Sequence, residues 1–318
     1  MLSMTETRQP RGNPGAGLWL APQTRRKKSN HLGGAPGIPY LFIGPAILFT
    51  GVFVIGPLLQ TVWLSFFEWD GVSLGKWVGF SNYLAAFRNP QLLQAFTHSL
   101  IFVVTFCALP VFLGMVLAAM LSRQKLRGLA AFRTILFLPQ VISMVVVGVA
   151  WRWMYADNGT VNQVLQLAGI RVTTAWLGDF TWALPFIAII GTWVMSGLCM
   201  VLFLAGIGKI DSELYDAAKV DGAGPVREFF SVTFPGLRQE LSVAVTITII
   251  AALRSFDLVY VTTGGGPGTS TIVPGTEIYR LAFRAGEVGA ASTIAVLLTL
   301  LIFAVVFAIT RLLREEQS

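Results

Sequence analysis

The sequence predicts an all-helical membrane protein with six transmembrane helices and one polar loop between the fourth and the fifth. Of the 318 residues, 54% are hydrophobic and only 12% are charged, and the mean hydropathy is +0.69. The apolar residues form long blocks, and ~20 such residues are needed for a helix to cross ~30 Å of hydrocarbon. In contrast, residues 207–239 are polar, which indicates a loop that something outside the bilayer recognises.

Apolar blocks of the required length occur six times in the sequence. The predicted spans are residues 40–66, 97–121, 135–155, 182–206, 240–262 and 289–311. They make a six-span domain at 39–313, followed by a short cytoplasmic tail at 314–318. Prolines interrupt four of the spans, at Pro45, Pro57, Pro110, Pro139 and Pro185. Kinks are expected there, and they fit either flexing around a pathway or a static bundle.

The distribution of Lys and Arg predicts the orientation in the membrane. An even number of spans places both termini on one side, together with the 122–134 and 207–239 loops. These four segments hold 16 of the 23 Lys and Arg residues, and the opposite loops hold five. Because positive loops stay in the cytoplasm, both termini are predicted to be cytoplasmic. This topology accounts for the net charge of +7, so nucleic-acid binding is not needed to explain it.

The N-terminal segment at 1–38 predicts a disordered, basic cytoplasmic tail. It is rich in Pro, Gly, Arg and Lys and has no apolar periodicity. The run Arg25–Lys28 is a topology signal, or it contacts anionic lipid at ~1 kcal/mol per charge. A cleavable signal peptide is not expected, because the first apolar block is too long for one. Cys107 and Cys199 lie inside predicted spans and read as small core residues.

The polar loop predicts two short helices joined by a tight turn. Asp211 or Ser212 can cap the first helix, and Gly222 suits the left-handed position that ends it. Pro225 fits the first position of the second helix, which Pro235 is expected to end. The apolar side chains of this helix-turn-helix are Leu214, Ala217, Ala218, Val226, Phe229 and Phe230. One short hairpin cannot cover them, so we expect another surface to dock there.

A spaced pattern of acidic and small residues lies in the same loop. It consists of Asp216-Ala217-Ala218, two further residues, Asp221-Gly222-Ala223, then Phe229 and Phe234-Pro235. This pattern resembles the EAA signature of permease subunits in binding-protein-dependent ABC importers. Asp216 replaces Glu, Phe234 replaces Leu, and Arg238 stands where a proline often follows. The resemblance assigns contact with an ATPase to Glu213, Asp216, Ala217, Ala218, Asp221, Gly222, Ala223, Phe229 and Pro235.

Other segments extend the resemblance over most of the chain. They are Gly79–Tyr83, Asn158-Gly159-x-x-Asn162, Phe256–Pro267, Ile278-Tyr279 and Ala282-Phe283, which are similar to the maltose and glycerol-phosphate type of sugar importer. The resemblance implies a bacterial-type inner-membrane protein with several partners. These are a second permease subunit, favouring a heterodimer, two cytoplasmic ATPase subunits, an extracytoplasmic sugar-binding protein and a di- or oligosaccharide. The sequence does not identify the sugar.

The sequence lacks the motif that an ATPase would need. A phosphate-binding loop requires Gly-x4-Gly-Lys-Ser/Thr, whereas Gly208-Lys209 is followed by Ile210 and has Phe203 at the first glycine position. We therefore expect this chain not to be an enzyme and to bind no cofactor or metal, with ATP and Mg on the partner ATPase. A secondary transporter is the alternative, but Asp257 is its only candidate ion-coupling carboxylate. An intramembrane enzyme is disfavoured because His31 and His98 are the only histidines.

Charged residues within the spans mark a candidate solute pathway, because a charge in hydrocarbon costs at least ~2.5 kcal/mol unless it is paired or faces water. Arg254 and Asp257 lie three residues apart and predict either a structural ion pair within one helix or a polar cavity for solute. The resemblance places solute contacts nearby and in the fourth span. The candidates are Gly191, Trp193, Met195, Arg254, Ser255, Asp257 and Tyr260. Arg152 is expected to reach the outer interface.

Overall fold

The computed structural model describes residues 38–122, 128–170 and 173–315. The tail predicted at 1–38 lies outside this range apart from its last residue, as do residues 316–318. The chain divides into two units, Met1–Val54 and Ile55–Ser318. In the described part of the first unit, α1 (Ile38–Thr50) leads into the π-helical η1 (Gly51–Ile55).

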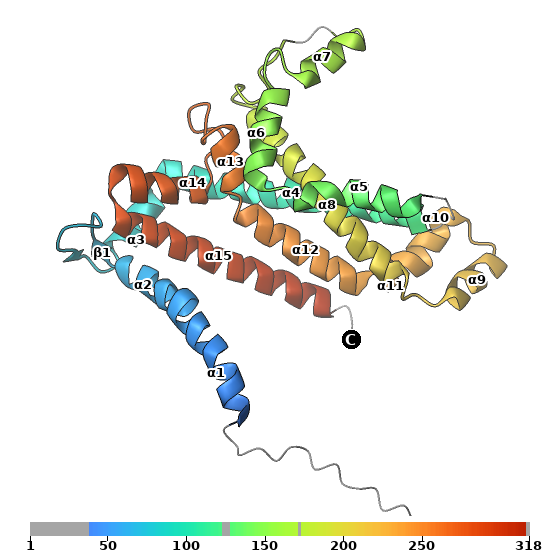
Figure 1. Cartoon of the computed structure of the whole chain (residues 1–318), viewed down its shortest axis with the longest axis horizontal. Helices are drawn as coiled ribbons and strands as arrows, with labels where there is room; N and C mark the ends of the chain where they lie inside the picture. The colour runs from blue at the N-terminus through green and yellow to red at the C-terminus, as the bar shows by residue number, and fades with distance from the viewer. Residues whose placement is uncertain (1–37, 123–127, 171–172, 316–318) are drawn as a thin grey trace, which may run out of the picture. The chain divides into compact units, whose positions relative to one another are not determined.

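The second unit is built from helices (Figure 1). The longer ones are α2 (Gly56–Leu64), α4 (Pro90–Ser122), α5 (Leu129–Val141), α6 (Met144–Met154), α8 (Ala183–Ile207), α12 (Arg238–Leu253) and α15 (Val288–Glu315). The shorter ones are α3 (Ser81–Arg88), α7 (Thr160–Leu167), α9 (Ser212–Val220), α10 (Pro225–Glu228), η2 (Phe229–Thr233), α11 (Phe234–Gly236), α13 (Asp257–Thr262), α14 (Pro274–Tyr279) and η3 (Arg280–Ala285). A short antiparallel pair, β1 (Phe67–Glu68) and β2 (Lys76–Trp77), is the one departure from the predicted all-helical class within the described residues.

Four helices are long and apolar enough to cross a membrane within the described part of the chain, or up to six if each bent pair counts as one span. The four are Phe42–Leu64, Pro90–Ser122, Ala183–Ile207 and Val288–Arg311. The bent pairs are Leu129–Val141 with Met144–Met154, at 97°, and Pro225–Gly236 with Arg238–Leu253, at 72°. The helical, multi-span character predicted from composition is therefore present, but the third and fifth predicted spans are not straight helices.

The bend in the third predicted span does not lie at its proline. Pro139 remains inside α5, and the chain leaves the helix at Ile142, whose φ and ψ are −78° and 137°. The Ile142 amide donates to the carbonyl of Pro139 at 3.3 Å, which closes a short final turn. A proline removes one backbone donor and weakens the turn around it, but the break itself comes where the chain turns to form α6.

The fifth predicted span, 240–262, is interrupted in its C-terminal half. Helix α12 ends at Leu253, Arg254 occupies the C-cap position, and α13 begins only at Asp257. The two pieces share α8 as a neighbour, but α12 packs mainly against α4 and α15 whereas α13 packs mainly against α6. The interruption is therefore held in place by tertiary contacts on both sides.

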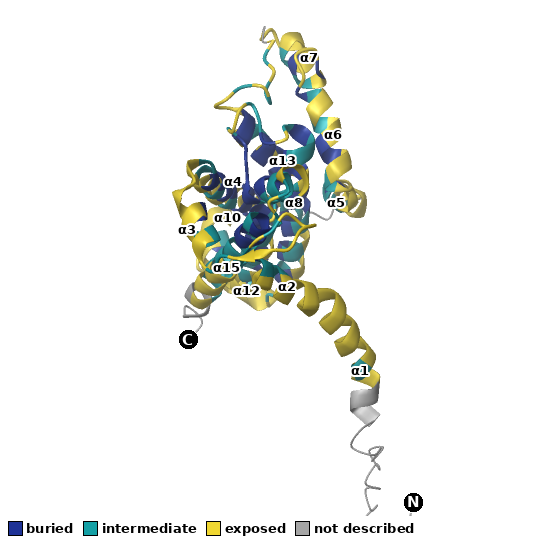
Figure 2. Ribbon diagram, turned by 90° about the vertical axis from the view of Figure 1, so that its left-hand side faces the viewer, coloured by how far each residue is buried: buried dark blue, intermediate teal, exposed yellow. Residues whose placement is uncertain are grey.

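Close contact between α4 and α8 forms the centre of the bundle, where Figure 2 shows the buried residues gathered. Small residues allow the approach: a Cβ atom on Gly114 would overlap the Cβ of Cys199 and lie 2.7 Å from the amide nitrogen of Met200. On α8, a Cβ on Gly191 would overlap the ring of Phe106. Small residues at helix crossings let backbones approach closely in membranes, where packing drives association.

Glycine also seats α5 against the same helix, because a Cβ on Gly197 would overlap the carbonyl of Leu136. Both cysteines are free and buried, with Cys199 inside the α4–α8 contact, as their position in the spans predicted. His98 is buried too, and its Nδ1 lies 2.9 Å from the carbonyl oxygen of Ile272. This histidine joins α4 to the segment before α14.

The motif at Asn158–Asn162 builds the connection between α6 and α8. The amide nitrogen of Asn162, a fully buried residue, donates to the carbonyls of Ala156, Asp157 and Thr174. Its oxygen accepts from the indole nitrogen of Trp176 at 2.8 Å. One side chain thus holds the loop on both sides of α7.

A second asparagine plays a similar part at the end of α2. The amide of Asn82 donates to the carbonyls of Ser65 and Phe67, both at 2.9 Å. The hydroxyl of Tyr83 lies 2.7 Å from that of Ser65, and the hydroxyl of Thr293 on α15 donates to the Ser65 carbonyl. The Gly79–Tyr83 motif therefore ties α2, α3 and α15 together.

We expect Gly114→Ala to lower the thermal stability of the detergent-purified protein, because the added methyl overlaps α8 and over-packing costs ~1–3 kcal/mol. The measurement is the melting temperature from thermal unfolding. Gly208→Ala is the matched control, since its new Cβ would meet nothing closer than 3.6 Å. Equal melting temperatures for the two variants would contradict the close approach of α4 and α8.

Candidate functional site

The connection between α8 and α12 forms a projecting helical knob, defined here as residues 211–236. Helix α9 begins where the carboxylate of Asp211 accepts from the amide of Glu213 at 3.0 Å. It ends at Gly222, whose φ of +71° is left-handed. The amide of Ala223 bonds back to Ala218 and that of Gly222 to Lys219, so the free carbonyls of the last turn are satisfied. These caps are the ones that the sequence predicts.

The structure of the second half of the knob differs from the prediction that Pro235 ends the second helix. Pro225 begins α10, as predicted, but Pro235 does not end the helical segment. The chain widens into the π-helical η2 and continues as α11 to Gly236, and the 72° bend follows there. Pro235 is tolerated because it lies in the first turn of α11, where its missing N–H is least needed.

Polar contacts join the two halves of the knob and fix its base. The hydroxyl of Tyr215 on α9 lies 3.2 Å from that of Thr233 on η2. At the base, the ammonium of Lys209 donates to the carboxylate of Glu240 at 2.8 Å, and Glu240 is only 9% exposed. A Cβ on Gly206 would lie 2.5 Å from the side chain of Leu237, so α8 and the start of α12 approach closely.

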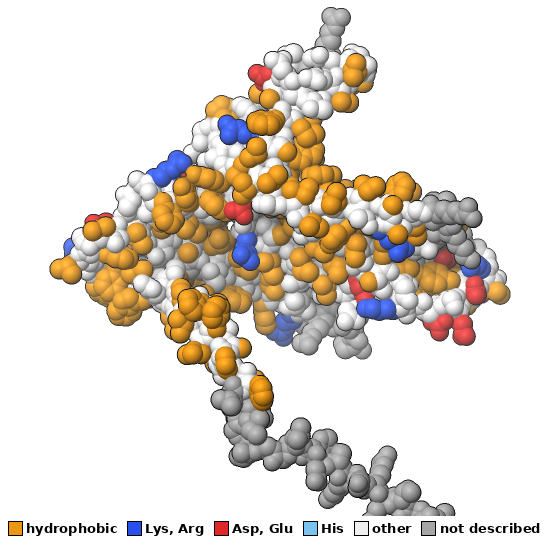
Figure 3. All heavy atoms as spheres, viewed as in Figure 1, with side chains coloured by type: hydrophobic (Ala, Val, Ile, Leu, Met, Phe, Trp, Pro, Cys, Tyr) orange, Lys and Arg blue, Asp and Glu red, His pale blue; other side chains and the backbone are white. Residues whose placement is uncertain are grey.

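The outer surface of the knob is apolar and uncovered. Its large exposed apolar side chains are Leu214, Val220, Val226 and Phe230, with 55% to 88% of each exposed. The predicted coupling residues Glu213, Asp216, Ala217, Asp221, Gly222 and Pro235 are exposed, while Ala218, Ala223 and Phe229 are half-buried. Figure 3 shows acidic side chains gathered over the end of the second unit where α9 lies. A hollow of about 700 Å³ lies beside them, lined partly by Tyr215 and Asp216.

A cavity of about 350 Å³ opens where the fifth predicted span is interrupted. Its lining comprises Phe106, Met144, Met195, Ile247, Ile250, Ala251, Arg254, Ser255, Phe256, Asp257 and Leu258. This volume falls within the ~300–1,000 Å³ that small-molecule sites usually occupy. Four of the predicted pathway residues, Met195, Arg254, Ser255 and Asp257, lie together in this lining.

Arg254 and Asp257 are not an intrahelical pair. Arg254 ends α12 and Asp257 begins α13, so the helical spacing that would align them is lost. Both side chains are exposed, and within the described residues neither forms an ion pair. Between them, the hydroxyl oxygen of Ser255 is buried without a hydrogen-bond partner in the described structure. The cavity lining therefore carries a guanidinium and a carboxylate, with the buried hydroxyl of Ser255 between them in sequence.

The other predicted pathway residues lie outside this lining. Gly191 packs against the ring of Phe106, one layer behind the cavity. Trp193 contacts Trp151, with ring centroids 5.6 Å apart. Tyr260 stacks on Phe256, with ring centroids 5.2 Å apart, and is not among the residues that line the cavity. Arg152 is exposed, which agrees with its predicted position at an interface.

Sequence reasoning missed several residues of both regions. Phe106 and Ile247 line the cavity, but nothing distinguishes them from the many other apolar residues of the spans. The Lys209–Glu240 pair at the base of the knob was also missed. A carboxylate so close to the start of an apolar block was an available signal, because a buried charge needs a partner.

Comparison with known proteins supplies the family. Residues 110–316 match the family described as binding-protein-dependent transport system inner membrane component. The probable ABC transporter permease protein YurN of Bacillus subtilis (strain 168) is 38% identical and covers 84% of this chain and 92% of the relative. The lactose transport system permease protein LacF of Rhizobium radiobacter is 36% identical, with 77% of this chain and 83% of the relative covered.

A solved structure shares the fold. The crystal structure of a bacterial ABC transporter involved in the import of the acidic polysaccharide alginate superposes with a TM-score of 0.75 at 23% identity, over 87% of this chain and 95% of that chain. The matched span of the family and the similarity to its relatives lead to one conclusion. The chain belongs to the family of binding-protein-dependent transport system inner membrane components.

Proposed function

We propose that this chain is a six-span permease subunit of an ATP-driven importer that moves a sugar delivered by an extracytoplasmic binding protein. The knob carries the proposal, because it exposes an apolar surface on a capped, rigid helix that a partner must cover. Membership of a binding-protein-dependent transport family supports the same reading. It also weighs against a secondary carrier, which would need neither a binding protein nor an ATPase.

The proposed topology counts α5 with α6 as the third span and α12 with α13 as the fifth, and it leaves residues 225–236 in the knob. Six spans place both termini on one side, and the 16 Lys and Arg residues of the segments on that side favour the cytoplasm. The knob then faces the cytoplasm, where an ATPase would dock. The chain has no phosphate-binding loop of its own, so ATP and Mg would be bound by two separate ATPase subunits.

The nature of the solute and the other partners is inferred from the relatives. The names of three relatives refer to lactose, diacetylchitobiose and sulfoquinovosyl glycerol, all of which contain a sugar. A similar structure is described as an alginate transporter in complex with an alginate pentasaccharide-bound periplasmic protein. We propose that this chain likewise transports a sugar, works with a binding protein and pairs with a second permease subunit in a heterodimer.

The cavity suits such a solute and lies at the interruption between α12 and α13. The side chains of Arg254 and Asp257 can hydrogen-bond sugar hydroxyls, and the rest of the cavity lining is largely apolar. Interrupted membrane helices expose backbone groups that can bind solute, and their ends can act as hinges. Beyond the two interruptions, α6 and α13 pack on each other, with Gly148 against Val261. Closure of the ATPases would move the knob and open this outer pair.

The decisive experiment is recovery of the complex from gently solubilised membranes, followed by mass spectrometry and an ATPase assay. We expect a nucleotide-binding subunit to co-purify and to be lost from the triple variant Leu214→Ser, Val226→Ser, Phe230→Ser, because the apolar surface of the knob is removed. Leu167→Ser is the matched control, since Leu167 on α7 is 89% exposed. A chain that purifies alone and transports in liposomes without ATP would establish a secondary carrier instead.

Gly222→Leu tests coupling at the knob. Nothing lies within 4 Å of the position that a Cβ would take, so a new side chain would point into the space reserved for the partner. The left-handed backbone adds strain of ~1–2 kcal/mol, which is too little to unfold the chain. ATP-dependent uptake should fall below a tenth of the wild-type rate, roughly the loss expected for a barrier raised by ~1.4 kcal/mol or more.

Gly169→Leu is the control for that variant, because Gly169 has a φ of +85° and is equally open but lies after α7. It should carry the same backbone strain and keep uptake. Normal uptake by Gly222→Leu would exclude a coupling role for this turn.

Arg254→Ala and Asp257→Ala test the cavity. Each should lower uptake about tenfold, since a hydrogen bond to a charged group is worth ~1.5–3 kcal/mol. The double variant should be at least as impaired, because the two side chains are not paired. Initial uptake rates in proteoliposomes provide the measurement, with Lys76→Ala in the exposed β2 as control. Restoration of uptake in the double variant would show that the pair is structural and that the site lies elsewhere.

A further inference from the structure

A ladder of four aromatic rings leads away from the cavity. Phe256 lines the cavity and stacks on Tyr260, with centroids 5.2 Å apart and ring planes 26° from parallel. Tyr279 lies 5.7 Å from Phe256 and 4.8 Å from Tyr260. Phe283 follows at 5.3 Å from Tyr279. Phe256, Tyr260 and Tyr279 thus form one packed cluster beside the cavity, and Phe283 on η3 extends it.

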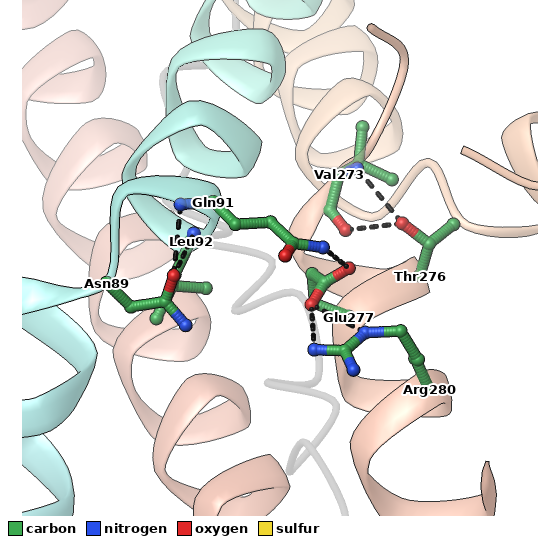
Figure 4. A network of polar contacts seen from close by, with 7 residues as sticks. All are labelled: Asn89, Gln91, Leu92, Val273, Thr276, Glu277 and Arg280. Atoms are coloured by element: carbon green, nitrogen blue, oxygen red, sulfur yellow. Dashed lines mark hydrogen bonds and ion pairs between the residues drawn. The ribbon is translucent and has the colours of Figure 1, made fainter. Parts of the chain in front are cut away.

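Two features bring the helices together at this ladder. A Cβ on Gly275 would lie 2.9 Å from the Cβ of Phe256, so only glycine lets α14 approach so closely. The opposite side of α14 is fixed to α4, as Figure 4 shows: the amide of Gln91 donates to Glu277 at 3.1 Å, and the guanidinium of Arg280 donates to the same carboxylate at 2.8 Å. Glu277 is 4% exposed, so this anchor is buried.

The outer end of the ladder is open. Phe283 is 77% exposed, while Phe256, Tyr260 and Tyr279 are half-buried. The guanidinium carbon of Arg284 lies over the ring of Tyr279 at 5.7 Å, which helps to orient that ring. Phe283 is part of a π-helical turn, and such turns often occur at functional sites.

We propose that Phe256, Tyr260, Tyr279 and Phe283 form a saccharide track that binds successive pyranose rings of a chain extending out of the cavity. The inference rests on the proposed sugar transport. Pyranose rings have apolar C–H faces that stack on aromatic rings, and tyrosine adds a hydroxyl for the sugar edge. The cavity is small, at about 350 Å³, so a longer saccharide must continue outside it.

Continuity with the cavity favours a saccharide over other occupants of the track. Phe256 belongs to both the cavity wall and the ladder, so a chain held at Arg254 and Asp257 would meet the rings next. Lipid acyl chains or a second permease could also cover Phe283. Neither, however, would make the effect of removing a ring depend on the length of the transported saccharide.

The experiment measures ATP-dependent uptake by the whole reconstituted complex for labelled saccharides of increasing length. The probes are lactose, diacetylchitobiose and its tetrasaccharide homologue, and alginate di- and pentasaccharides. Tyr279→Ala with Phe283→Ala should raise KM about tenfold for the longer member of a transported series, as loss of ring stacking implies. KM for the short member and kcat for both should change less than about twofold.

Two further variants make the result specific. Tyr279→Phe keeps the ring and should behave as wild type, whereas Phe303→Ala removes a ring that is 68% exposed on α15 and should change nothing. Equal effects on long and short saccharides, no effect on either, or wild-type uptake restricted to disaccharides would each overturn the track. If the wild-type complex takes up none of the probes, the proposed sugar transport itself fails, which is a different result.

Discussion

Close packing of α4 on α8 is the constraint on which the rest of the second unit depends. A membrane interior offers no hydrophobic force between helices, so association relies on contact area and on satisfied backbone groups. Gly114 and Gly191 remove the side chains that would hold the two helices apart, and Gly197 does the same for α5. With this centre fixed, α12 lies along α4, and the interruption after Leu253 falls beside Phe106. The cavity is therefore a consequence of the central packing.

Features set by local chemistry could be predicted from the sequence, and those set by distant contacts could not. Block length and composition predicted helical spans, and Asp211, Gly222 and Pro225 predicted the caps of the knob because capping involves only adjacent residues. The breaks at Ile142 and Arg254 were not predicted, since they depend on the packing of α6 against α13. Pro235 was predicted to end the second helix of the knob. This prediction was wrong because the π-helical turn η2 precedes the proline and the chain stays helical through it.

The residues of the candidate site also divide into those that the sequence marked and those that only the packing explains. Charge marked Arg254 and Asp257, and the break between them then placed Ser255 and Met195 in the same cavity lining. Of the residues that the resemblance suggested, Gly191 packs behind that lining on Phe106, and Trp193 contacts Trp151 instead. The apolar walls carry no sequence signal, because leucine, isoleucine and phenylalanine serve equally as lipid-facing, core and cavity residues.

The Lys209–Glu240 contact gives the base of the knob a mechanical property. Glu240 lies in the first turn of α12 and is nearly buried, whereas Lys209 follows the end of α8. Sliding one helix past the other would separate the nearly buried carboxylate from its ammonium partner. The joint therefore has low compliance. A force applied to α9 from outside would therefore rotate α8 and α12 together. The movement would reach the bundle and would not be absorbed at the base of the knob.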